Sequence, residues 1–299
     1  MDQKVIRVSD YLMERLSSEG VKHIFTVTGR GALFLTDAVA KLKELKYICS
    51  HHEQASAYSA VAYAQYNNKL GVCLVSTGCA ATNTMSGVLS AWQDGVPTIF
   101  ISGQNVLNET TRFTGIPLRT YGQQEADVIP LVDSITKYAV MIDSPEKIVY
   151  ELEKALFLAQ NGRKGPVWID VPLDIQSMRI DPKTLPKFIP PVPMKENATP
   201  EEIDQVQALL NQSKRPVILI GSGIHSSGAG DVLRSFVEKY QIPVVYAPSA
   251  PDTYGSENLL SIGSVGAMGC SRAGNFAVQN ADFLLVIGCR LTSLVTGVD

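Results

Sequence analysis

One glutamate of this sequence occupies a position where a carboxylate could carry acid–base chemistry. Glu53 follows His51 and His52, and the surrounding pattern predicts a strand that ends near residue 50 and a helix that begins at Glu53. A ligand at the carboxyl end of a parallel strand would meet this side chain. The alanine-rich residues that follow predict a buried, apolar setting for the carboxylate. A helix start with an acidic residue that complements the dipole explains Glu53 equally well, and adjacent histidines make a poor metal pair because neighbours point apart.

A second candidate is the run of small residues from Gly78 to Asn83, which follows a predicted buried strand. Small residues there would let a flat ligand approach the backbone, and the N–H groups at a helix start are free to donate. The alternative is a compact turn that is capped by Thr82 or Asn83. Cys79 has no identifiable His or Asn partner, which favours a packing role. The loop at residues 29–31 matches neither GxGxxG nor a P-loop.

Strands and helices alternate along the part of the chain that must position these residues. This alternation, with short connections, predicts an α/β fold with a doubly wound, mostly parallel sheet. The apolar residues of the 70–76 segment are continuous, as expected for a strand that is covered on both faces. Strands are expected at residues 23–27, 47–50, 70–76, 98–102 and 166–171, and helices at 5–20, 32–42, 53–66, 83–92 and 145–160.

The pattern stops in a proline-rich segment and then begins again. We therefore predict a first domain at residues 1–180, a linker at 181–199 and a second doubly wound domain at 200–299. The second domain is short for such a fold, so we expect it to be incomplete and the chain to be a fragment. Its helices are expected at residues 201–211 and 228–240, and its strands at 216–221, 243–246 and 282–288.

Composition narrows the class of protein. The chain has 299 residues, 45% of them hydrophobic, and a formal net charge of −3. This near-balanced charge does not indicate nucleic acid or an anionic membrane as a partner. The five cysteines are scattered and odd in number, which argues against a disulfide framework or a zinc site. With no membrane-length apolar run and no secretion signal, a cytoplasmic location is expected.

The order of these segments resembles the acetolactate-synthase-like family of thiamine-diphosphate enzymes over essentially the whole chain. The match begins with a GV…F opening and continues through His-Glu-Gln, a small-residue turn, ISGQ, a QE…ITK stretch and a final GPVWIDVP stretch. These segments lie at residues 20–31, 52–54, 75–83, 94–104, 124–137 and 162–172. So many segments in the same order are too many to arise by chance.

The resemblance implies an architecture. Residues 1–180 would be a pyrimidine-binding domain, and the second domain would be a Rossmann-like central domain. A third domain, which binds the diphosphate and Mg²⁺, would be absent, so this chain would hold no metal ligand and would be inactive alone. The family's cofactor lies between subunits, which implies a homodimer or homotetramer.

The resemblance also assigns roles to residues. Glu53 would be catalytic: its carboxyl group would hydrogen-bond N1′ of the cofactor's pyrimidine and favour the imino form. Further cofactor contacts would come from Gly29, Gly78 and Asn83, and the substrate side would be formed by Thr28, Arg30, Gln123, Gln124 and Lys137. The implied activity is a carboligase that decarboxylates a 2-keto acid such as pyruvate and transfers the acyl unit to a carbonyl acceptor. A decarboxylase or oxidase on the same scaffold and a non-catalytic paralogue are the alternatives.

Several positions depart from the family pattern. Residues 28–30 replace Pro-Gly-Gly, and Gln123 replaces a phenylalanine, which leaves the acceptor open. The central domain of acetolactate synthases binds FAD, and this chain has similar positions, whereas Leu291 to Leu294 replace Phe-Asp-Asp-Arg. Bound FAD and an empty fold therefore both stay open. The possible FAD contacts are Gly221, Gly223, Gly266, Met268 and Arg290.

Overall fold

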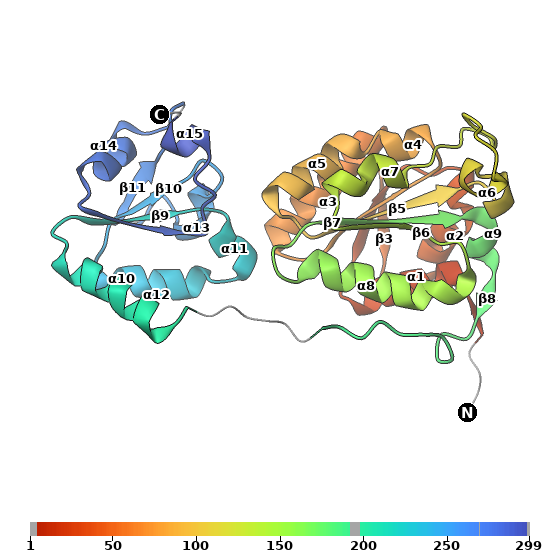
Figure 1. The fold of residues 1–299 in the computed structure, drawn as a ribbon, viewed down its shortest axis with the longest axis horizontal. Helices are drawn as coiled ribbons and strands as arrows, with labels where there is room; N and C mark the ends of the chain where they lie inside the picture. The colour runs from red at the N-terminus through yellow and green to blue at the C-terminus, as the bar shows by residue number, and fades with distance from the viewer. Residues whose placement is uncertain (1–4, 192–197, 269, 298–299) are drawn as a thin grey trace. The chain divides into compact units, whose positions relative to one another are not determined.

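The computed structural model describes residues 5–191, 198–268 and 270–297. The chain divides into two compact units, residues 1–191 and 192–299, each of which is an α/β fold around its own parallel sheet (Figure 1). Among the helices in these described ranges, none combines the length and apolarity needed to cross a membrane.

The first unit is built on a six-stranded sheet in the order β3-β2-β4-β5-β7-β6, in which every neighbouring pair is parallel. All residues of β4, β5 and β7 are buried, because helices cover both faces of the sheet. The doubly wound α/β fold is thus confirmed. The strands are β2 (His23–Thr26), β3 (Lys46–Cys49), β4 (Gly71–Val75), β5 (Thr98–Gln104), β6 (Tyr138–Met141) and β7 (Pro166–Pro172).

Helices pack on the two faces and form two separate cores. On one face lie α1 (Val8–Ser18), α2 (Leu33–Lys41) and α8 (Ile148–Gln160), and on the other lie α3 (Glu53–Asn67), α5 (Met85–Asp94) and α7 (Ile129–Val132) (Figure 1). Shorter helical turns connect them: α4 (Cys79–Thr82), α6 (Thr111–Thr114), α9 (Leu173–Ser177) and the 3₁₀ turns η1 (Arg30–Ala32), η2 (Leu107–Glu109), η3 (Asp133–Ile135) and η4 (Pro145–Lys147).

The strand order reverses beside β2. From β2 the chain passes through α2 to β3 on one side, and from β3 it returns through α3 to β4 on the other side of β2. The loops that leave β2 and β4 therefore diverge toward opposite faces. Such a switch point leaves a crevice at the carboxyl ends of the strands, which is where ligands bind in open α/β sheets.

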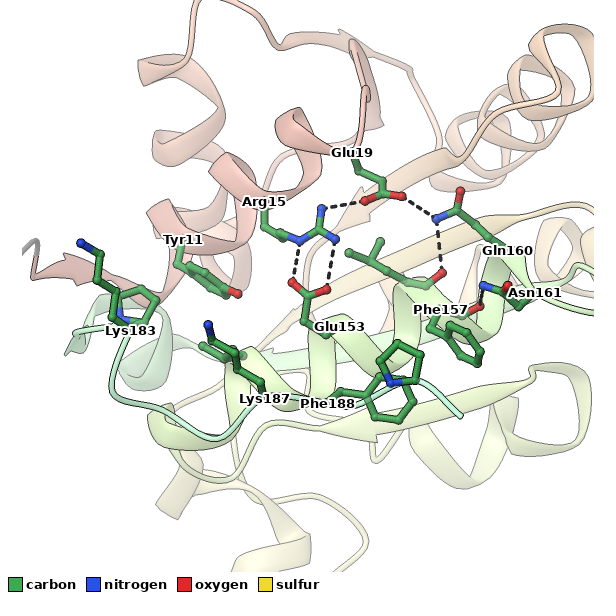
Figure 2. A pocket seen from close by; sticks show the side chains of 14 residues that line it. Tyr11, Arg15, Glu19, Glu153, Phe157, Gln160, Asn161, Lys183, Lys187 and Phe188 are labelled. Atoms are coloured by element: carbon green, nitrogen blue, oxygen red, sulfur yellow. Dashed lines mark hydrogen bonds and ion pairs between the residues drawn. The ribbon is translucent and has the colours of Figure 1, made fainter. Parts of the chain in front are cut away.

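The residues that follow this sheet remain attached to it. A short antiparallel pair, β1 (Ile6–Arg7) with β8 (Arg179–Ile180), joins the two ends of the first unit. Beyond β8, part of the predicted linker runs along α1 and α8, where Phe188 packs edge-on against Tyr150 and against Phe157. A hollow of about 590 Å³ lies under this segment (Figure 2). The first half of the linker is thus a strap on the first unit.

An ion-pair cluster joins α1 to α8 beside this strap. The guanidinium of Arg15 donates to both carboxylate oxygens of Glu153, at 2.6 and 3.0 Å, and to Glu19 at 2.7 Å (Figure 2). The Arg15–Glu153 pair connects residues that are 138 positions apart, so it fixes the two helices against each other. Bidentate arginine–carboxylate pairs are stronger than single exposed ion pairs.

We expect Arg15→Met to lower the free energy of unfolding by about 1 kcal/mol, because methionine keeps the apolar stem but leaves the half-buried Glu153 carboxylate without its arginine. The matched control is Lys147→Met, which removes the exposed pair between Lys147 and Asp143, four residues apart, and should cost no more than about 0.5 kcal/mol. Urea unfolding followed by tryptophan fluorescence measures both, since Trp92 and Trp168 lie in the first unit. Equal losses in the two variants would contradict this role of Arg15.

The second unit has a four-stranded parallel sheet in the order β11-β10-β9-β12. Its first helix starts with a capping box, in which the Thr199 hydroxyl accepts from Glu202 N–H, and with Pro200 at the first helical position. The strands are β9 (Pro216–Ile220), β10 (Val244–Tyr246), β11 (Ser261–Ser264) and β12 (Phe283–Ile287), and the helices are α10 (Pro200–Gln212), α11 (Gly223–Ser227), α12 (Gly230–Tyr240), α13 (Pro251–Tyr254), α14 (Arg272–Asn280) and α15 (Ser293–Thr296).

Candidate active site

A pocket of about 350 Å³ lies at the carboxyl edge of the six-stranded sheet. The loops that follow β2, β3, β4, β5 and β7 all contribute to it, so it lies at the switch point of the strand order. This is the position at which an open α/β sheet binds its ligand. The lining residues are Thr28, Gly29, Arg30, Gly31, Glu53, Ser76, Thr77, Cys79, Ala80, Asn83, Gln104, Asn105, Gln123, Gln124 and Leu173.

Glu53 is the carboxylate of this pocket. It is the first residue of α3, which is capped by the His52 ring, whose Nδ1 accepts from the Gln54 N–H at 3.2 Å. The side-chain amide of Asn83 donates to Glu53 Oε2 at 2.9 Å. Glu53 is half-buried, so the prediction of a fully buried carboxylate is wrong for this chain. The apolar residues expected around Glu53 begin one turn further along α3, at Ala57, and face the core.

Gly78 acts through close packing and is not itself part of the lining. Its φ is +61°, and an ideal Cβ added there would lie 1.6 Å from the carbonyl oxygen of Gln124. The missing side chain therefore brings the backbone of Gln124 against the turn that follows β4. Both neighbours of Gly78 line the pocket, and one of them, Cys79, is exposed, which contradicts the expected packing role of this cysteine.

The loop after β2 faces the Gln123 side of the pocket. The Arg30 guanidinium donates to Gln123 Oε1 at 3.0 Å, and the Gly31 N–H donates to the Ser76 hydroxyl at 3.1 Å. An ideal Cβ at Gly29 would lie 2.5 Å from the Ser76 side chain, so this glycine allows the loops after β2 and β4 to touch. Thr28 and Arg30 are exposed at the pocket, where a bound molecule could meet them.

A buried carboxylate fixes the loop that carries Gln123 and Gln124. Glu125 is 8% exposed and accepts from the Thr111 N–H and hydroxyl, both at 2.7 Å, and from the Tyr121 N–H at 2.9 Å. These three bonds tie the start and the middle of the segment between η2 and α7 to Glu125 near its end. The backbone of Gln124 has a φ of +55°, a rare value for a side chain of this kind, which the surrounding bonds must hold.

Sequence analysis missed several residues of the pocket. Gln104, Asn105 and Leu173 line it, and each stands at or directly after the carboxyl end of a buried strand. The strand-end argument that identified Glu53 would have found them if it had been applied to every strand. Gln104 and Asn105 are almost completely buried, at 1% and 5% exposed, which gives the pocket a polar wall that solvent does not reach.

Lys137 lies elsewhere, so its predicted place on the substrate side is not supported by this structure. It precedes β6, at the amino edge of the sheet, whereas the pocket is at the carboxyl edge. Its ammonium donates to the carbonyl oxygens of Asn161 and Arg163, both at 2.7 Å. Burial lowers the pKa of Lys137. In this chain the Lys137 side chain therefore stabilises the turn that precedes β7.

We expect Lys137→Met in the full-length protein to leave the KM for any 2-keto acid within about twofold of the wild-type value. The same change should lower the free energy of unfolding by about 1–2 kcal/mol, because two carbonyls lose a charged donor. Steady-state kinetics and urea unfolding on one preparation measure both. A KM raised tenfold or more with unchanged stability would return Lys137 to the substrate site.

The possible FAD residues of the second unit also gather at a carboxyl edge, after β9, β11 and β12. Their glycines, however, serve contacts within the chain. An ideal Cβ at Gly221 would lie 2.3 Å from the Gly288 carbonyl oxygen, and one at Gly266 would lie 2.6 Å from the Leu294 carbonyl oxygen. Met268 is exposed. These contacts explain the glycines without a dinucleotide, and FAD binding stays a prediction.

Metal-binding side chains do not cluster in the described residues, where no group of three or more His, Cys, Asp or Glu is placed to hold an ion. The lining instead offers one carboxylate, the Arg30 guanidinium, the Cys79 thiol, several amides, hydroxyls and backbone groups, with the carboxylate and the Asn83 amide together on one side. Such a set suits an uncharged, planar, nitrogen-containing ring, because the carboxylate and the amides can pair with its donors and acceptors.

Comparison with known families agrees with this geometry. The model of the thiamine pyrophosphate enzyme N-terminal TPP binding domain matches residues 6–131, and that of the thiamine pyrophosphate enzyme central domain matches residues 203–299. Each match falls within one of the two compact units. The chain therefore carries the N-terminal and central domains of the thiamine pyrophosphate enzyme family.

Similar curated proteins are acetolactate synthases. The chain is 34% identical over 288 residues to the acetolactate synthase large subunit of Lactococcus lactis, covering 96% of this chain and 48% of that protein. It is 34% identical over 296 residues to the probable acetolactate synthase large subunit of Methanocaldococcus jannaschii (97% and 48%) and 33% identical over 295 residues to the chloroplastic acetolactate synthase of Arabidopsis thaliana (97% and 42%). The chain belongs to the acetolactate synthase-like family of thiamine pyrophosphate enzymes, and it spans about half the length of these relatives.

Proposed function

We propose that the full-length protein is a thiamine-diphosphate-dependent carboligase that decarboxylates a 2-keto acid, such as pyruvate, and transfers the acyl unit to a carbonyl acceptor. The observation that carries this proposal is the Asn83–Glu53 hydrogen bond of 2.9 Å inside the switch-point pocket of a thiamine pyrophosphate-binding domain. The relatives that this chain resembles are acetolactate synthases.

The residues of the pocket fit the aminopyrimidine end of thiamine diphosphate. Glu53 offers a carboxyl group to a ring nitrogen, and Asn83 beside it orients that group. Ala80 and Leu173 give the lining apolar surface, and the volume of about 350 Å³ admits a small heterocycle. When bound, thiamine diphosphate supplies the carbon nucleophile and the electron sink that 2-keto acid chemistry needs.

In this proposal one group of side chains contacts the cofactor and a second group contacts the substrate. Glu53 holds and moves a proton at N1′ of the pyrimidine, and Asn83 keeps its carboxyl group in place. Arg30 and Gln123, joined at 3.0 Å, stand on the other wall, where a cationic donor would hold the carboxylate of a 2-keto acid. Gln124 and Thr28 complete this substrate side.

Mg²⁺, the diphosphate-binding residues and the partner subunit would come from parts of the assembly beyond these residues. We propose a homodimer or homotetramer with the active site between subunits, as the family resemblance implies. The exposed position of Asn83 and the incomplete burial of Glu53 support this arrangement, because a second surface must cover them to exclude water from the chemistry.

Product analysis of the full-length protein tests the proposed function. The protein is incubated with thiamine diphosphate, Mg²⁺ and pyruvate, with and without added aldehydes or 2-keto acids as acceptors. A C–C-coupled product is expected as the main product. Free aldehyde or acetate as the main product would replace the carboligase with a decarboxylase or an oxidase, and no turnover of any 2-keto acid would favour a non-catalytic paralogue.

A further inference from the structure

A completely buried carboxyl group stands directly behind the pocket. Asp170 on β7 is 0% exposed, and both of its oxygens accept hydrogen bonds from the neighbouring strand β5. The Ser102 hydroxyl donates to Oδ1 at 2.6 Å, and the Gln104 side-chain amide donates to Oδ2 at 3.2 Å. The indole N–H of Trp168 donates to the Ser102 hydroxyl oxygen at 2.9 Å, so this hydroxyl is oriented from both sides.

The network continues from Gln104 to the wall of the pocket. Gln104 Nε2 also donates to the carbonyl of Ala126 at 2.9 Å, while its Oε1 accepts from the backbone N–H of Asn105 at 3.0 Å. The Asn105 amide donates to the carbonyl of Gln123 at 3.1 Å, and Gln123 accepts from Arg30. Hydrogen bonds thus link Asp170 to Arg30 through Gln104, Asn105 and Gln123, with the backbone and side chain of Asn105 and of Gln123 each serving one bond, and every residue from Gln104 onward along this path lines the pocket.

A buried carboxyl is costly, and a fold keeps one only when its partners compensate for the loss of water. Burial, helped by nearby Asp127, outweighs the bonds from Ser102 and Gln104 and the charge of Arg112, so the pKa of Asp170 is raised to about 7. Only the ionised form accepts from both donors. A proton on Oδ2 would face the Gln104 N–H, which would have to turn away.

We propose that Asp170 is a positioning residue of the active site. Its carboxylate fixes the amide of Gln104, and through Asn105 it holds Gln123 and Arg30 on the wall that faces the substrate. The identity of the molecule that this wall binds rests on the proposed function. The hydrogen-bond network between Asp170 and the wall does not depend on it.

The decisive variant is Asp170→Asn in the full-length protein, with Ile169→Val as the matched control. Ile169 is equally buried on the same strand but belongs to the core on the opposite face of the sheet. Hydrogen exchange at the Asn105 backbone amide should become at least tenfold faster in Asp170→Asn and change less than twofold in Ile169→Val, because that amide donates to Gln104 Oε1. Equal exchange in the two variants would overturn the proposal.

Kinetics test the consequence for the pocket. Asp170→Asn should raise the KM for the 2-keto acid about tenfold, with kcat and the dissociation constant of thiamine diphosphate within about threefold of wild type. Gln104→Leu, which leaves Asp170 in place, should produce the same effects on hydrogen exchange and on KM. The double variant Gln104→Leu/Asp170→Asn should show the same exchange rate and KM as Gln104→Leu alone. If the effects of the two substitutions added up in the double variant, or if KM stayed unchanged despite faster exchange, the positioning role of Asp170 would be overturned. A protein without turnover of any 2-keto acid contradicts the proposed function instead, and the exchange measurement then still decides whether Asp170 holds the wall.

Discussion

Glu53→Gln lowers the turnover of the full-length protein by about 10²–10⁴-fold and leaves its fold intact. Glutamine has the shape of glutamate and can still accept the Asn83 amide through its carbonyl oxygen, so the local structure should survive. What it loses is the ability to hold and release a proton at the pyrimidine nitrogen. The expected signature is a fall in kcat with an unchanged unfolding midpoint.

The control for this prediction is Glu201→Gln. Glu201 is an exposed acidic residue in the first turn of α10, as Glu53 is in the first turn of α3, so both complement a helix dipole. If the dipole were the whole role of Glu53, the two variants would lose similar small amounts of stability and keep their turnover. Wild-type rates in Glu53→Gln would therefore remove Glu53 from the mechanism.

Gly78→Ala lowers the free energy of unfolding by about 3 kcal/mol or more and disorders the pocket. The added methyl group would strain a backbone with a φ of +61° and would overlap the Gln124 carbonyl, which lies 1.6 Å from the ideal Cβ position. The turn after β4 and the loop that carries Gln124 must then separate. Urea unfolding measures the loss of stability, and the affinity for thiamine diphosphate should fall with it.

Gly162→Ala separates the two causes of this loss. Gly162 has nearly the same φ, +64°, but nothing lies within 4 Å of its ideal Cβ position. This variant therefore carries backbone strain without a clash and should cost only about 1 kcal/mol. If both alanine variants were equally stable, close packing of Gly78 against Gln124 would not hold the pocket together.

Much of the fold follows from local sequence patterns. The central strands are continuous apolar runs because both faces of the sheet are covered, and such runs are easy to recognise, as at β4. β6 and β11 were not expected. β6 is an apolar run of only four residues, Tyr138–Met141, and a run this short does not distinguish a strand from a helical turn. The residues of β11 are half-buried and mixed in polarity, and Gly263 obscures this strand further. Their place in the sheet is decided by tertiary pairing.

Those parts of the candidate site could be predicted whose residues are identified by the order of motifs and strands along the chain. Glu53 and Asn83 are unremarkable alone, but they follow β3 and β4, the two strands that flank β2, and the structure brings them to 2.9 Å. Lys137 was misplaced because a family motif was transferred without asking which edge of the sheet it would reach. It precedes its strand, so it belongs to the amino edge. The incomplete burial of Glu53 was not foreseen, because Ala57 and Ala60 face the core instead of surrounding the carboxylate, and Ala55 is exposed.

The central claim is that Glu53 controls a proton on bound thiamine diphosphate. The most direct test is the rate at which the C2 proton of the cofactor exchanges with D₂O on the full-length protein, followed by NMR after acid quench at saturating cofactor. Wild-type protein should accelerate this exchange over free cofactor, and Glu53→Gln should lose at least about 100-fold of that rate while still binding the cofactor. Equal exchange rates in the two proteins would contradict the account.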